Sequence, residues 1–131
     1  MKKFIESILF FSLVLISVFS CKMPDNKGRL CVQNNSSVET DLISQVYVNS
    51  EYGAKGSLYW DDSENGLAVG KSASFYIEEG EYYVTVVVKK LKSVLSNEYE
   101  TKEFQFGYKN PVKVKEDSVT IIKYDGTGIY N

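Results

Sequence analysis

The chain has 131 residues, with 15 Lys and Arg against 17 Asp and Glu and a formal net charge of −2. A negative balance argues against a nucleic-acid partner, because binding to phosphate needs a surplus of basic side chains. The sequence contains no histidine, which removes the commonest general base and the commonest metal ligand. We therefore expect no enzymatic activity, no cofactor and no metal site.

The first 21 residues have the pattern of a secretion signal. Lys2 and Lys3 supply a positive start, and an apolar run from Ile8 to Phe19 follows. This run is too short to span a bilayer, which takes about 20 apolar residues. It ends in the sequence VFSC at residues 18–21.

These four residues resemble the lipobox of bacterial lipoproteins, in which an aliphatic and a small residue precede the cysteine that begins the mature chain. Val18, Ser20 and Cys21 match that pattern. The resemblance implies that residues 1–20 are removed and that lipid on Cys21 attaches the chain to a membrane. It also implies a place in the cell envelope, at the outer membrane or cell surface rather than the inner membrane. An ordinary cleaved signal and an uncleaved short anchor are the alternatives.

A lipid on Cys21 leaves Cys31 without a partner for a disulfide within the chain. Cys31 lies in a β pattern, and we interpret it as a small apolar residue, buried or half-buried, rather than a reactive thiol. The polar segment 21–28 is expected to be a tether that keeps the domain close to the bilayer. The remaining residues, 29–131, form the predicted domain.

Alternating apolar and polar residues predict β-strands along most of this domain. Apolar residues on both faces of segment 81–89 predict a central strand. Residues 90–98 have partly helical spacing, but so short a helix would be weak, and we expect a long loop or hairpin tip. Seven or eight strands at this spacing predict an all-β fold, an antiparallel sandwich or a small barrel. The expected strands are 29–33, 42–48, 57–60, 72–77, 81–89, 100–106, 112–115 and 118–124.

Three segments carry turn and core residues in a further pattern: VQNNS at 32–36, VYV at 46–48, and the stretch from Val69 to Val84. Together they resemble small immunoglobulin-like or prealbumin-like domains of bacterial envelope proteins. The resemblance implies a single antiparallel Greek-key β-sandwich. Such domains usually bind or space other molecules, and their fold alone does not name the ligand.

Tyr59 and Trp60 directly precede an acidic loop that starts with Asp61 and Asp62. Large aromatic side chains with polar tips suit recognition surfaces, so we predict a ligand site at these four residues with a protein or glycan partner. The alternative is that the aromatic rings form core and cross-strand pairs. The loop 61–66 also matches the first half of a calcium loop, but the glutamate that the motif needs is missing, and a solvated acidic turn is preferred.

Our interpretation is a membrane-anchored envelope lipoprotein with a binding or structural role through its surface loops. An inhibitor or accessory subunit of an envelope or secreted enzyme is the second hypothesis, with the segment 90–98 entering the partner. A long hairpin with an apolar tip would favour this second hypothesis. An exposed stack of Tyr59 and Trp60 would instead favour ligand binding at these two residues. Lysines in 89–92 and glutamates in 98–103 predict charge pairs across this hairpin, each of little energy.

Overall fold

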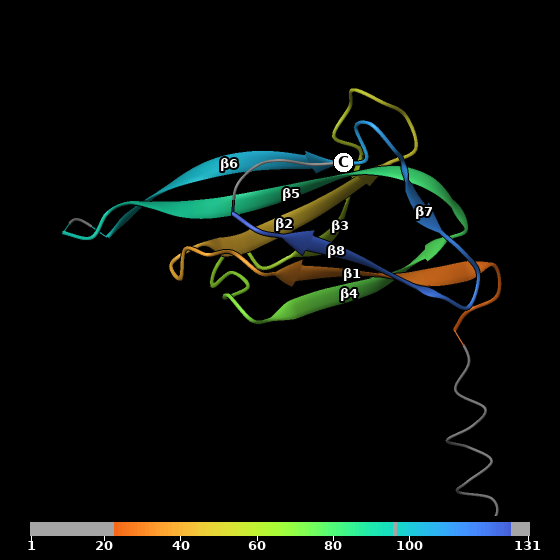
Figure 1. Ribbon diagram of the computed structural model, residues 1–131, viewed down its shortest axis with the longest axis horizontal. Helices are drawn as coiled ribbons and strands as arrows, with labels where there is room; N and C mark the ends of the chain where they lie inside the picture. The colour runs from red at the N-terminus through yellow and green to blue at the C-terminus, as the bar shows by residue number, and fades with distance from the viewer. Residues whose placement is uncertain (1–22, 96, 127–131) are drawn as a thin grey trace, which may run out of the picture.

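The computed structural model describes residues 23–95 and 97–126. Eight β-strands form two sheets in this part of the chain, and it contains no helix that could cross a membrane (Figure 1). The all-β prediction is thus confirmed, and each predicted strand is present. The strands are β1 (Lys27–Asn34), β2 (Leu42–Asn49), β3 (Ser57–Asp61), β4 (Ser72–Glu78), β5 (Gly80–Ser93), β6 (Glu98–Phe106), β7 (Val112–Val114) and β8 (Val119–Tyr124).

One sheet has the order β4-β1-β8, and the other has the order β3-β2-β5-β6, with β7 paired to the start of β5. Neighbouring strands are antiparallel except β1 and β8, which are parallel. A fully antiparallel sandwich was expected, and this pair is the exception. The physical reason is that β8 starts at the end of the molecule where β1 also starts, as the pairing of Arg29 with Val119 shows.

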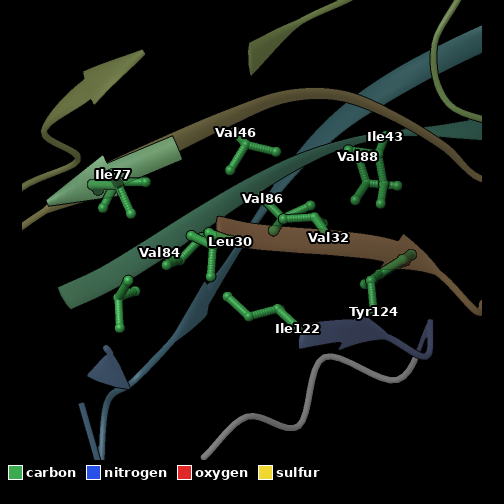
Figure 2. Close-up of a cluster of buried hydrophobic side chains, with 12 residues drawn as sticks. Leu30, Val32, Ile43, Val46, Ile77, Val84, Val86, Val88, Ile122 and Tyr124 are labelled. Atoms are coloured by element: carbon green, nitrogen blue, oxygen red, sulfur yellow. The ribbon is translucent and has the colours of Figure 1, made fainter. Parts of the chain in front are cut away.

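The two sheets face each other across one hydrophobic core (Figure 2). Val84, Val86 and Val88 alternate along β5 and are fully buried against side chains from β1, β2, β4 and β8. Each such side chain adds about 1.5–3 kcal/mol to stability. On the other face of β5, Thr85 and Val87 are also buried, with 2% and 3% exposure. The central position predicted for this strand is confirmed, because β2 and β6 flank it.

The β5–β6 hairpin extends beyond the body of the sandwich (Figure 1). Pairing of β2 with β5 stops at Leu42 and Lys89. Pairing of β6 with β5 continues to Ser93 and Glu98. Past Lys89 the hairpin is therefore a two-stranded ribbon. The ambiguous segment 90–98 belongs to the outer part of this hairpin. Its strands run further than the sequence predicted because cross-strand pairs continue almost to the turn.

The chain enters the sandwich at the end opposite to the hairpin tip (Figure 1). Just before β1, Pro24 O accepts from Lys27 N at 3.1 Å, and Asn26 N donates to Glu116 Oε1 at 3.2 Å. Glu79 N in turn donates to Asn26 O at 2.9 Å. The later part of the expected tether is therefore bound to the body. Cys21 and the leader lie outside the described residues.

Candidate functional site

The tip of the β5–β6 hairpin presents apolar side chains to solvent. Val94 is 84% exposed and Leu95 is 100% exposed. Tyr99, on the returning strand, is 43% exposed and pairs with Leu91. Aliphatic side chains at the end of a projecting ribbon add nothing to the core, so this end of the hairpin is a candidate contact surface. We call residues 93–95 and 97–98 the hairpin tip.

Lys90 fastens the base of this hairpin to the body. Its Nζ lies 2.9 Å from Oδ2 of Asp41, whose side chain is 1% exposed. The same ammonium lies 5.9 Å from the ring centroids of Phe104 and Tyr124. The low dielectric around a buried carboxylate strengthens this attraction relative to a surface pair, and the base of the ribbon is thereby held in place.

Two hydroxyl groups complete the surroundings of the Asp41 carboxylate. Ser36 Oγ donates to Oδ2 at 2.7 Å, and Tyr124 OH donates to it at 2.9 Å. Burial, and then the hydrogen bond to Asp41, raise the pKa of Tyr124 above its usual value. The tyrosine therefore stays protonated and remains a hydrogen-bond donor. Oδ1 of Asp41 is buried and has no hydrogen-bond partner among the described residues.

Asn34 ties the neighbouring loops to this group. Its Nδ2 donates to the main-chain oxygens of Asp41 at 2.9 Å and Leu67 at 2.8 Å, and its Oδ1 accepts from Ser36 N at 3.2 Å. One buried amide thus joins the loop before β2 to the loop before β4. We call Asn34, Ser36, Asp41, Lys90 and Tyr124 the buried polar cluster; it organises the end of the sandwich from which the hairpin projects.

The structure gives Tyr59 and Trp60 different surroundings. Tyr59 is 41% exposed, and its ring centroid lies 5.2 Å from that of Phe75 on β4. Trp60 is half-buried and packs against the hydrophobic core. The two neighbours therefore do not present one shared aromatic surface. Ligand binding at this pair stays a prediction.

The acidic loop folds as a turn beside the hairpin base. Asp61 Oδ1 accepts from Ser63 N at 3.2 Å and also from its hydroxyl, and this hydroxyl contact holds the pKa of Asp61 below its usual value. Asp62 Oδ1 accepts from Asn65 N at 3.3 Å. Lys89 Nζ donates to Ser63 O, which links loop and hairpin. Over residues 23–95 and 97–126, no three His, Cys, Asp or Glu side chains gather as a possible metal site.

The ion pairs of the hairpin differ from those predicted. Lys90 bonds to Asp41 rather than to a glutamate of the facing strand. Glu103 pairs with Lys55 from the loop before β3, and Glu100 lies 3.6 Å from Lys102 on its own strand. Sequence reasoning missed Asp41, because an aspartate just before a strand usually indicates a turn. Its partners come from distant parts of the chain.

No protein-family model, curated protein or solved structure matches this chain. Its function therefore has to be inferred from the geometry of these residues.

Proposed function

We propose that this chain is a membrane-anchored envelope lipoprotein that binds another protein through the tip of its β5–β6 hairpin. The exposure of Val94 and Leu95 at the end of a fastened ribbon carries the proposal. A two-stranded ribbon is marginally stable on its own. Fastening its base through Lys90 and Asp41 reduces the conformational entropy lost on binding, and two aliphatic side chains can then fill an apolar pocket.

The proposed anchor gives the hairpin a direction. Three residue steps from Cys21 to Pro24 span at most about 10 Å, and Pro24 O accepts from Lys27 N, which belongs to the first residue of β1. The bilayer would then lie near the start of β1. The 14 residues of β5 rise about 45 Å along the strand from that end. The tip would point away from the membrane, which favours a protein partner over lipid.

We further propose that the sandwich is a Greek key of the immunoglobulin-like or prealbumin-like kind. The side-by-side placement of the first and last strands supports this topology. The repeated passage of the chain from one sheet to the other also supports it.

Photo-crosslinking in the intact envelope tests the binding site. A photoreactive amino acid at position 95 of the full-length chain should give a discrete adduct with one protein. The same group at Val38, which is 44% exposed at a different loop, should not. Leu95→Asp should abolish the adduct formed from a reactive group at position 94. Absence of an adduct from both tip positions would contradict hairpin binding.

The anchor is tested separately with Cys21→Ala. The variant should leave the membrane fraction and lose the mass of its lipid. Unchanged processing and unchanged sedimentation with membranes would contradict the lipoprotein assignment and would leave the hairpin result standing.

An enzyme inhibitor or accessory subunit is the second candidate function. The finger-like shape of the hairpin favours it, because an apolar tip can occupy a substrate cleft. If the crosslinked partner is an enzyme, wild-type protein should change its activity and Leu95→Asp should not. An unaffected activity would leave the chain as a binding module alone.

A further inference from the structure

We propose that Tyr52, Tyr83 and Tyr108 form a second binding surface, which takes a polysaccharide chain. We call these residues the tyrosine cluster. They come from the loop between β2 and β3, from β5, and from the segment after β6. The cluster is separate from the hairpin tip, since Tyr83 pairs with Asn49 at the opposite end of β5.

The Tyr52 ring contacts the rings of both Tyr83 and Tyr108. The centroid of Tyr52 lies 5.5 Å from that of Tyr83, with an interplanar angle of 71°. It also lies 5.5 Å from that of Tyr108, at 54°. Tyr52 is 59% exposed and Tyr108 is 61% exposed. Tyr83 is half-buried, so Tyr52 and Tyr108 are the rings of the cluster that a ligand can reach most readily.

Specific interactions shape the loop that carries Tyr52. Asn49 Nδ2 donates to Ala54 O at 3.0 Å, and Asn49 Oδ1 accepts from Glu51 N at 3.1 Å. Lys55 pairs with Glu103 on β6 and lies 4.6 Å from the Tyr47 ring centroid. These contacts attach the loop to the outer face of the sheet. The exposure of Tyr52 is therefore a feature of an ordered loop, and a fixed ring loses little entropy on binding.

The chemistry of the surface favours sugar over protein. The large apolar side chains exposed in loops 50–56 and 107–111 are the tyrosines Tyr52 and Tyr108, whereas the hairpin tip presents the aliphatic Val94 and Leu95. A tyrosine offers an apolar face and a hydroxyl that donates and accepts. A sugar ring offers the matching C–H face and hydroxyl groups. A hydrogen bond with Tyr108 raises the pKa of Tyr52, so the Tyr52 hydroxyl stays neutral at physiological pH.

Small-molecule sites are concave and bury most of the ligand, whereas Tyr52 and Tyr108 are more than half exposed, so the cluster suits a chain of sugars better than a single small molecule. If the proposed envelope location is correct, glycan strands of the cell wall are the polysaccharide within reach. This choice of glycan rests on the proposed function; the assignment of sugar chemistry does not.

Co-sedimentation with insoluble peptidoglycan, and in parallel with chitin, tests the proposal. Full-length protein purified in detergent should sediment with at least one of them. The double variant Tyr52→Ala/Tyr108→Ala should lose at least tenfold in affinity. The matched control is Tyr76→Ala/Tyr99→Ala, since these residues are 47% and 43% exposed elsewhere, and it should bind like wild type. Thermal unfolding monitored by circular dichroism checks that both double variants fold.

Chitin binding without peptidoglycan binding would keep the sugar surface and remove the cell-wall assignment. Failure of wild-type protein to bind either polymer would overturn the proposal, as would equal binding by both double variants. Photoreactive groups at position 52 that capture a protein while neither polymer binds would assign the surface to a protein partner instead. Leu95→Asp should retain polysaccharide binding. The polysaccharide proposal and the hairpin proposal can therefore fail independently of each other.

Discussion

The Nζ atom of Lys90 lies 2.9 Å from Oδ2 of Asp41, across 49 positions of sequence. The lysine side chain is 20% exposed and the aspartate side chain is 1% exposed. The pair joins the base of a projecting hairpin to a loop on the body. Its disruption should therefore affect both the stability of the fold and the direction of the hairpin.

Replacement of either partner should destabilise the protein. Asp41→Ala removes the acceptor of one ammonium and two hydroxyl groups, and we expect a loss of about 3–5 kcal/mol in the free energy of unfolding. Lys90→Met leaves a buried carboxylate with two hydroxyl donors, and a smaller loss of about 2 kcal/mol is expected. Urea unfolding measures both. Lys92→Met, at an exposed position of the same strand, should stay within about 0.5 kcal/mol of wild type; an equally small effect of Lys90→Met would contradict this account.

Tyr124 should make the fold sensitive to alkaline pH. Its folded pKa is raised above the usual 10.0, chiefly by burial, so its contribution to stability is complete below about pH 10. At higher pH the unfolded chain loses this proton while the folded chain keeps it. Stability should then fall by up to about 1.36 kcal/mol per pH unit for this group.

Tyr124→Phe isolates that effect. The variant should be less stable at pH 8 by about 1.5–3 kcal/mol, because it lacks the hydrogen bond to a charged acceptor. Between pH 10 and 11.5 the gap to wild type should narrow. Guanidinium unfolding over this pH range provides the measurement, and a gap that stays constant would show that Tyr124 ionises equally in both states.

Asn34 should couple two loops through its single amide. Asn34→Ala leaves the buried main-chain oxygens of Asp41 and Leu67 without this donor, and we expect a loss of about 1–3 kcal/mol. Hydrogen exchange should accelerate at Ile43, where β2 follows the first loop, and at Leu67 in the second loop, whose main-chain groups bond to each other. Gln33→Ala, at the preceding half-buried position, is the control. Faster exchange in one loop alone would argue against the coupling.

The strands could be predicted because their determinants are local. Alternating valines from Val84 to Val88 indicate an inward face, and polar turns bound most strands. Cys31 was predicted to be a small apolar residue, buried or half-buried, and it is 7% exposed. These properties depend on residues close together in the chain, which a period-two pattern reveals.

The buried polar cluster could not be predicted because its contacts are distant. Tyr124 and Asp41 lie 83 positions apart, and no local pattern indicates such a pair. The packing of Trp60 against the core could not be predicted for another reason. A register shift between Val46 and Tyr47 in the pairing of β2 with β3 changes which side chains share a face, and a regular alternation does not reveal it.

Gly28 should be required at the start of the sandwich for reasons of space. A Cβ at this position would lie 2.3 Å from Lys115 O and 2.7 Å from Val114 Cγ1. The carbonyl belongs to the main chain, so Gly28→Ala must push the segment after β7 away from β1, at a cost of about 1–3 kcal/mol. Thermal unfolding should show the loss.

Gly80→Ala is the matched control, because its nearest neighbour would be the Tyr82 hydroxyl at 3.3 Å, at the end of a side chain that can move. It should change stability by less than about 1 kcal/mol. Equal destabilisation by the two alanines would show that backbone freedom, rather than the close approach of β1 to the chain after β7, selects glycine at position 28. A larger effect at Gly28 would mean that this end of the sandwich, where the proposed anchor joins, depends on contact between β1 and residues 114–115.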